Sequence, residues 1–246
     1  MSQRARPPVP TPGTTALFLD ADATLIEVPP HGEVGIVAPE RILRLAQLYD
    51  RLDGALALVS GRTVEALDEL VAPLNLTLLG VHGLDRRLDD GRRVRPEADA
   101  ALASARAALG TFALAHDGVR FEDKGVALAL HAGGDAAVAA RDAAERALAA
   151  ADGRLVLQAT ADTVELLPAG HDAATALAAL AQEPPFQGRR PVFVAGGEAH
   201  SAGLRAAETR GGMGVVVGPE PAADAGGWRL DDVRALESWL DSWLSR

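Results

Sequence analysis

An alternation of short apolar strands and helices, which stops after residue 83 and resumes at residue 171, constrains the fold of this chain more than any other feature. Strand and helix patterns follow one another in the order β-α-β-α-β before the break, and a similar alternation returns after it. The expected elements cover residues 16–19, 39–52, 55–59, 63–74 and 76–81, then 171–182, 191–194, 201 onward, 213–217 and 231 onward. This order predicts an α/β fold in which a parallel sheet has helices on both faces.

The interruption has a pattern of its own and predicts a second, smaller unit. Its expected elements are two arginine-bearing strands at 84–94, an alanine-rich helix at 97–115, a strand at 120–131, a helix at 135–151 and a strand pair at 155–167. This mixture is typical of an inserted α+β module. We therefore expect a disordered lead at 1–15, a discontinuous core at 16–83 and 171–246, and a cap at 84–170, with a ligand cleft between core and cap.

Composition excludes several classes of function. The 246 residues carry a formal net charge of −10, which argues against nucleic acid or an anionic membrane surface as a partner. The chain has no cysteine, so disulfides and thiolate chemistry are unavailable to it. It has no apolar run of about 18 residues and no apolar leader at its start, so we expect a soluble cytoplasmic protein.

The segment LFLDADATL, residues 17–25, ends the first predicted strand with two carboxylates. Asp20 closes the strand and Asp22 lies two residues further on. One carboxylate in such a pair can act as a nucleophile that binds a divalent cation, while the other exchanges a proton with the leaving group. Acids also cap helices and form turns at strand ends, so a structural role stays open. The position at the carboxyl end of a parallel strand favours the catalytic interpretation.

Two further motifs end the second and third predicted strands. In VSGR, residues 59–62, Ser60 precedes a helix, and a hydroxyl beside backbone N–H groups suits a phosphate. Arg62 adds positive charge there, although Ser60 is equally adequate as a helix cap. In GVHG, residues 80–83, His82 follows the strand directly. A lone histidine is usually structural, so His82 by itself does not predict catalysis.

Together these motifs resemble the haloacid-dehalogenase superfamily of phosphotransferases, and more narrowly the chain is similar to the trehalose-6-phosphate phosphatase family. The segments that carry the resemblance are LFLDADATL, VSGR, GVHGLDRR, FEDKGVALALH, VELLPAGHDAATAL and PPFQGRRPVFV. They follow the family order from residue 16 to about residue 218. The resemblance implies a Rossmann-like core with an inserted cap, and a reaction that converts trehalose 6-phosphate and water to trehalose and phosphate.

In the core, the resemblance implies a role for each motif residue. Asp20 would be the nucleophile that forms an aspartyl-phosphate. Asp22 would be the acid/base, and its backbone carbonyl would also bind Mg²⁺. Ser60 would bind the transferring phosphoryl group, and Arg62 and His82 would contact the substrate.

In the cap, the resemblance implies a grip on the sugar by Glu122, Lys124 and Glu165. Carboxylates and an ammonium suit a polyhydroxylated disaccharide, which offers many hydrogen-bond donors and acceptors and no charge. Lys124 is the single lysine beside 23 arginines, and this role offers a reason for a compact ammonium at that position. A solvated charged turn is the alternative interpretation of residues 122–124.

Two segments depart from the family pattern. The family has a lysine, which neutralises the phosphate and the nucleophile, where this chain has Ala173 and Ala174. The family has GDDxTDE, whose acids complete the Mg²⁺ site, where this chain reads AGGEAHS at 195–201. Phosphoryl transfer depends on positioning and on neutralising negative charge, so both departures affect the chemistry directly.

The lost positions, which include Gly196, Gly197 and His200, predict an impaired enzyme or a pseudoenzyme. Removing one preorganised electrostatic partner costs roughly 10²–10³ in rate, so two such losses should leave little activity. We expect Mg²⁺ to be bound weakly or not at all, because Asp20 and Asp22 alone supply few ligands.

Three hypotheses follow. The first is a family member that is catalytically silent or very slow and still binds trehalose 6-phosphate or trehalose. The second is a working sugar-phosphate phosphatase whose metal site is rearranged around Glu198 or His200 and in which Arg62 stands in for the lost lysine. The third is a non-catalytic interaction or regulatory protein. The sequence leaves the oligomeric state and any protein partner open.

Overall fold

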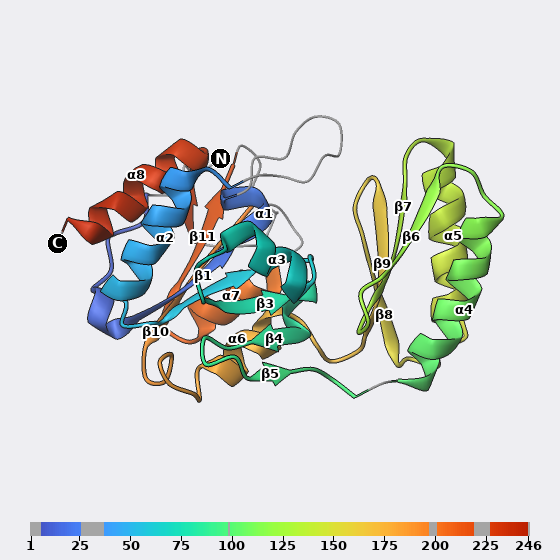
Figure 1. Cartoon of the computed structure of the whole chain (residues 1–246), viewed down its shortest axis with the longest axis horizontal. Helices are drawn as coiled ribbons and strands as arrows, with labels where there is room; N and C mark the ends of the chain where they lie inside the picture. Colours follow the sequence, from blue (N-terminus) through green and yellow to red (C-terminus); the bar gives the residue numbers. More distant parts are fainter. Residues whose placement is uncertain (1–5, 26–36, 98, 197–200, 219–226, 246) are drawn as a thin grey trace. The chain divides into compact units, whose positions relative to one another are not determined.

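The computed structural model describes residues 6–25, 37–97, 99–196, 201–218 and 227–245, and the chain forms two compact units (Figure 1). The first unit, here called the core, is made of Met1–Val94 and Asp172–Arg246, and the second, the cap, is Arg95–His171. Each unit has an apolar cluster of its own. The cap is therefore a single insertion into a unit to which the chain returns.

An eight-stranded sheet forms the centre of the core. Its spatial order is β12 (Trp228–Leu230), β11 (Met213–Val217), β10 (Arg190–Ala195), β1 (Thr15–Asp20), β2 (Leu56–Val59), β3 (Thr77–Gly80), β4 (Asp85–Arg87) and β5 (Arg93–Val94). Neighbouring strands from β12 to β3 are parallel. Leu19 on β1 lies opposite Val194 on β10, so the carboxyl ends of these two strands lie at the same edge of the sheet. Here this edge is called the core edge.

Helices cover both faces of the core sheet, as predicted. They are the short α1 (Ala21–Thr24), α2 (Pro39–Arg51), α3 (Val64–Val71), α6 (Ala173–Leu180), α7 (Ser201–Thr209) and α8 (Val233–Leu244), with 3₁₀ turns η1 (Pro12–Thr14) and η2 (Val81–Gly83). α2 packs against α8 and α6 packs against α7, and Figure 1 shows these pairs on opposite sides of the sheet. Trp239 and Trp243 of α8 are buried in the core, with their rings edge to face at 5.0 Å. No helix in the described ranges has the length and apolar character needed to cross a membrane.

The hairpin at residues 84–94 belongs to the core sheet, so the expectation that it opens the cap is wrong. β4 pairs with β3 in antiparallel orientation, with Arg86 opposite Leu79, and β5 continues the sheet. Asp85 on β4 is buried, and its carboxylate accepts hydrogen bonds from the Arg93 guanidinium on β5. β4 thus forms backbone hydrogen bonds with the side of β3 that faces away from β2. The local sequence does not show which strand will be the partner.

The expected disordered lead is also partly structured. Thr15 is the first residue of β1, Pro12 is buried, and the Trp239 indole donates a hydrogen bond to the Pro8 carbonyl at 3.3 Å. Residues 1–5 lie outside the described ranges. β12 was not expected from the sequence, because three residues are too few to show a strand pattern.

The cap is a four-stranded antiparallel sheet with two helices on one face (Figure 1). The strands, in spatial order, are β6 (Val119–Asp123), β7 (Leu128–Ala132), β9 (Thr163–Pro168) and β8 (Leu155–Ala159), and the helices are α4 (Ala100–Leu114) and α5 (Asp135–Ala149). Leu128, Leu130 and Leu166 pack with the helices in the apolar cluster. Alternate residues point to the opposite side. This opposite side is here called the polar face, and it carries Arg120, Glu122, Ala129, His131, Thr163 and Glu165.

The expectation of one continuous strand at 120–131 is wrong, because the chain turns back between β6 and β7. Gly125 has φ +79°, a left-handed conformation that favours glycine, and its N–H donates to the Asp123 carboxylate at 2.9 Å. The turn places Glu122 opposite Ala129 and Arg120 opposite His131.

Candidate functional site

Two carboxylates lie at the end of β1, at the core edge. Asp20 is the last residue of the strand and is buried, and Asp22 lies in the first turn of α1. The Asp22 N–H donates to Asp20 Oδ1 at 3.2 Å, and the Gly196 N–H approaches Asp20 Oδ2 at 3.4 Å. The Thr24 hydroxyl donates to the Asp20 carbonyl. The nucleophile candidate therefore has its carboxylate held by backbone N–H groups of two residues, one in α1 and one directly after β10.

Ser60 and Arg62, which follow β2, both reach the Asp22 carboxylate. The Ser60 hydroxyl donates to Asp22 Oδ2, and Arg62 Nε donates to Oδ1 at 2.6 Å. The backbone N–H of Arg62 also donates to Ser60 Oγ at 3.0 Å. An ionised carboxylate only accepts hydrogen bonds, so a hydroxyl and a guanidinium are well matched to it. The structure thus brings together four of the core residues selected from the sequence.

The GVHG loop is tied to the same place by its backbone. The Val81 N–H donates to the Arg62 carbonyl and the His82 N–H donates to the Ser60 carbonyl, both at 2.8 Å. Val81 has φ +49° and His82 has φ +57°. A left-handed conformation is strained for a β-branched residue, and such strain tends to occur at functional sites.

Gly61 provides the space in which the His82 ring lies. A Cβ atom built on Gly61 would stand only 2.8 Å from His82 Cε1. The position of the His82 ring therefore requires a residue without a Cβ atom at position 61. The structure places the buried His82 beside the VSGR loop, and its substrate contact stays a prediction.

The first turn of α6 adjoins the GVHG loop. A Cβ on Gly83 would lie 2.6 Å from the Ala176 Cβ and 3.7 Å from the Ala173 Cα. Asp172 caps this helix by accepting the Thr175 N–H at 2.8 Å. The buried Ala173, at the position that implied a lost lysine, thus opens the helix that packs on this loop, with a methyl group as its side chain.

In the cap, the polar face holds an ion pair and a hydrogen-bonded pair, which together include the three predicted sugar-binding residues. The Lys124 ammonium donates to Glu165 Oε1, and both side chains are buried. The Glu122 carboxylate Oε2 lies 2.6 Å from His131 Nε2. The hydrogen bond with His131 is the main cause that lowers the pKa of Glu122 below its ordinary value, with Lys124 adding to it and partial burial opposing it.

His131 is the residue of this cluster that sequence reasoning missed. Once a turn is placed before Leu128, the alternation ALALH puts His131 on the same side of the sheet as Ala129. Treating residues 120–131 as one strand hid this relation, since it left Glu122 and His131 on a single extended segment.

The family model for trehalose-phosphatase matches residues 18–198. The chain belongs to the trehalose-phosphatase family. Trehalose-6-phosphate phosphatase of Escherichia coli is 37% identical over 232 residues, which cover 92% of this chain and 85% of that protein. Most of the length of both proteins is thus aligned.

Solved structures show the same fold as this trehalose-phosphatase family member. The C-terminal domain of trehalose-6-phosphate phosphatase from C. albicans gives a TM-score of 0.80 at 15% identity, covering 99% of this chain and 98% of that chain. A phosphatase of the HAD enzyme superfamily from Bacteroides thetaiotaomicron gives 0.65 at 17% identity, covering 96% and 97%. The predicted α/β fold of the haloacid-dehalogenase type is confirmed.

The resemblance of the sequence motifs implied a Mg²⁺ site in the core, and the described residues do not fit a complete one. They include no group of three acidic, histidine or cysteine side chains that could hold a metal ion. Mg²⁺ requires oxygen ligands in octahedral arrangement, whereas Gly196 presents an N–H to Asp20. Gly197, Glu198 and His200 lie outside the described ranges. Weak or absent binding of Mg²⁺ stays a prediction.

Proposed function

We propose that this chain is a trehalose-6-phosphate phosphatase-like protein of trehalose biosynthesis that binds trehalose 6-phosphate, or a related sugar phosphate, and hydrolyses it very slowly or not at all. One contrast at the core edge carries the proposal. β1 and β2 bring Asp20, Asp22, Ser60 and Arg62 together, whereas β10 ends at Ala195 and the next residue, Gly196, presents a backbone N–H to Asp20 and has no side chain that could bind a metal ion.

Retained polar groups support binding. Ser60 and Arg62 supply a hydroxyl and a guanidinium, which are suited to a phosphoryl group. In the cap, Lys124 and the carboxylates of Glu122 and Glu165 supply donors and acceptors for the hydroxyls of a disaccharide. The E. coli relative is named for the same sugar phosphate, which favours this ligand over other phosphate esters.

The reaction expected of a complete site shows what this chain lacks. An Asp20 oxygen would attack phosphorus while the bond to the sugar oxygen breaks and Asp22 donates a proton to that oxygen. Water would then attack the aspartyl-phosphate, give its proton to Asp22 and release phosphate. In this chain both oxygens of Asp22 accept hydrogen bonds, from Ser60 and Arg62, so the leaving group would have to share this carboxylate with them.

Charge compensation is the larger deficit. Asp20 and Asp22 stand at the place where a phosphate dianion would arrive, and the buried Ala173 adds no cation there. Each missing electrostatic partner lowers the rate by roughly 10²–10³. We therefore expect the chain to retain binding of the sugar phosphate while its hydrolysis is very slow or lost.

A phosphate-release assay with trehalose 6-phosphate and saturating Mg²⁺ tests the proposal, with Asp20→Asn as the blank for nucleophilic catalysis. We expect the two proteins to release phosphate at indistinguishable rates, while trehalose 6-phosphate raises the Tm of the native chain, since binding to the folded state stabilises it. Release far above the blank would contradict impairment and favour a rearranged metal site, which Glu198→Gln would then weaken. A Tm that no trehalose compound raises, in either protein, would contradict binding and favour an interaction protein.

A further inference from the structure

We propose that His131 is a positioning residue, which fixes the carboxylate of Glu122 on the polar face so that it can accept a hydroxyl of the sugar. The inference rests on the proposed function, because it assigns the ligand's sugar part to this face. It adds to the binding residues a histidine that makes no sugar contact in this proposal and acts through Glu122.

The geometry holds the His131 ring at both nitrogens. Nε2 lies 2.6 Å from Glu122 Oε2 on β6, and Nδ1 lies 3.1 Å from Thr163 Oγ1 on β9. His131 is on β7 between these strands, directly opposite Thr163 and Arg120. A ring held from two neighbouring strands has a defined orientation, so the hydrogen bond that it makes to Glu122 is defined as well.

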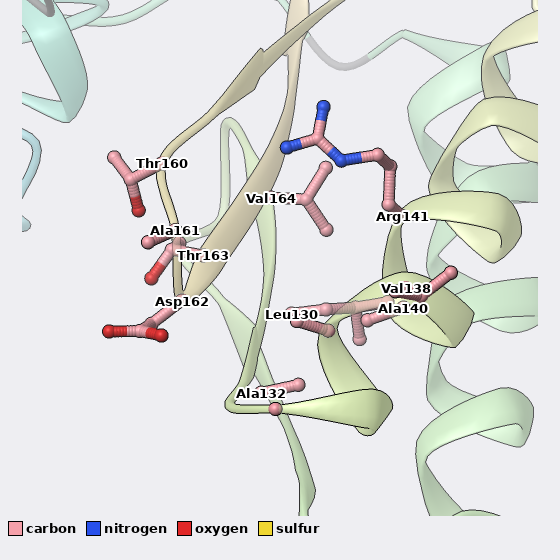
Figure 2. Close-up of a pocket in the computed structure, with 12 residues that line it drawn as sticks. Leu130, Ala132, Val138, Ala140, Arg141, Thr160, Ala161, Asp162, Thr163 and Val164 are labelled. Carbon is pink, nitrogen blue, oxygen red and sulfur yellow. The ribbon is translucent and has the colours of Figure 1, made fainter.

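The side chains of β9 alternate in the way this proposal requires. Figure 2 shows Val164 directed toward α5 and the Thr163 hydroxyl directed away from that helix. Between α5 and the β8–β9 turn lies a hollow of about 340 Å³, which Figure 2 displays with Arg141 and Asp162 among its lining residues. The His131–Thr163 hydrogen bond therefore belongs to the polar face.

Hydrogen-bond chemistry fixes the direction of the contact with Glu122. An ionised carboxylate has no proton to give, so His131 Nε2 must be the donor. In the neutral ring Nδ1 then accepts from the Thr163 hydroxyl, and in the charged ring Nδ1 donates to the same oxygen. Because a hydroxyl both donates and accepts, the arrangement of His131, Thr163 and Glu122 persists in both charge states of the ring.

The charges around His131 keep Glu122 ionised. Arg120 Nη1 lies 3.7 Å from Glu122 Oε2, and Lys124 also attracts this carboxylate while pairing with Glu165. Arg120 lies on β6, Lys124 follows β6 directly and Glu165 lies on β9, whereas α4 and α5 pack on the other face. The pKa of Glu122 is lowered, with the His131 hydrogen bond as the largest cause. Oε1 of Glu122 has no hydrogen-bond partner within the described residues, which leaves this oxygen to accept from a sugar hydroxyl.

The test compares His131→Ala with His131→Gln, in the full chain, because a glutamine amide can restore a donor to Glu122. His116→Ala is the matched control, since His116 is an exposed histidine of the same unit whose ring bonds the Phe112 carbonyl on α4. Carbon-13 NMR of the Glu122 carboxyl, without ligand, measures its pKa. Calorimetry with trehalose, which carries no phosphate, measures sugar affinity apart from the chemistry of the core edge.

We expect His131→Ala to raise the pKa of Glu122 toward its ordinary value and to weaken trehalose binding about tenfold, as for the loss of one hydrogen bond to a charged group. His131→Gln should recover part of the affinity, and His116→Ala should change neither quantity. An unchanged Glu122 pKa or an unchanged affinity in His131→Ala would overturn the inference. If the native chain binds no trehalose compound, the proposed function fails, and the sugar-positioning role falls with it, whatever the Glu122 pKa shows.

Discussion

The core edge and the polar face of the cap both gather carboxylates, but they differ in how the negative charge is balanced. On the polar face, Lys124 pairs with Glu165, and Glu122 is held by His131. At the core edge, Arg62 pairs with Asp22 at 2.6 Å, and Asp20 receives backbone N–H groups from Asp22 and Gly196, which carry partial charge. In our proposal, the groups suited to a neutral sugar are retained, while the charge compensation that a phosphoryl transfer needs is reduced.

Sugar recognition and phosphoryl transfer place different demands on these two regions. A sugar hydroxyl needs aligned donors and acceptors. The polar face keeps such groups aligned as long as its side-chain contacts stay formed. A transition state that carries several negative charges needs cations at fixed positions, and a backbone N–H replaces them poorly. The experiments that follow change one side of the comparison at a time.

Lys124→Ala breaks an ion pair on the polar face of the cap and should have the largest effect on stability. It removes the ammonium that faces the buried Glu165 carboxylate, which should lower the free energy of unfolding by about 3–5 kcal/mol. Chemical denaturation measures the loss. Arg106→Ala is the matched control, because Arg106 and Asp123 form a more exposed pair in the same unit, at 2.6 Å, which is expected to contribute about 0–1 kcal/mol. Equal losses in the two variants would show that the buried pair has no special weight.

The second experiment restores the family's lysine and acids at the core edge. The fourfold change Ala173→Lys, Gly196→Asp, Gly197→Asp and His200→Asp should raise phosphate release from trehalose 6-phosphate by roughly 10²–10³ or more, because it returns the groups that neutralise charge. Adding Asp20→Asn to this variant should abolish the gain. A gain that persists in the Asp20→Asn background would show that the activity does not use the proposed nucleophile.

Gly83→Ala tests how closely the core edge is packed. Gly83 has φ +96° and its added Cβ would clash with Ala176, so we expect a loss of about 2–4 kcal/mol from strain and overpacking together. Gly91→Ala is the control, because Gly91 has φ +84° but open space around it, and it should lose only about 1–2 kcal/mol. Thermal unfolding of the two variants separates the cost of the clash from that of the backbone. No difference would mean that α6 and the GVHG loop adjust freely.

Asp20→Asn should have the smallest effect on binding, and in the favourable direction. It removes a carboxylate that repels the phosphate dianion, so trehalose 6-phosphate should bind a few-fold more tightly, on the order of 0.5–1 kcal/mol. Trehalose without phosphate should bind equally to both proteins. Calorimetry at low salt measures the pair of affinities, and a weaker affinity for the phosphate ester would show that Asp20 helps to hold it.

Much of the fold could be predicted from the sequence because buried parallel strands have a strong local signal. Leu17–Leu19 and Val192–Val194 are short apolar runs, and both form central strands of the core sheet. Asp20 and Ser60 follow such strands directly, which placed them at one sheet edge. These inferences needed only hydrophobic pattern and chain order.

Features that depend on pairing partners could not be predicted in this way. The hairpin at 84–94 carries arginines like a surface ribbon, and only its pairing with β3 assigns it to the core. The turn at Gly125 interrupts a segment whose flanks both favour strand. His131 became a candidate only when β6, β7 and β9 were seen side by side.

The pairing of β1 with β10 also imposes an order on biogenesis. β1 leaves the ribosome before its partner β10, which follows only after the whole cap has been translated, since Asp20 and Gly196 are 176 residues apart. At about 5–20 residues per second this interval lasts roughly 10–35 s. Until it ends, β1 presents an apolar edge that other nascent chains can pair with. Synthesis of the inserted cap therefore delays completion of the core sheet. During this interval the unpaired strand β1 is the part of the chain that most needs protection by chaperones.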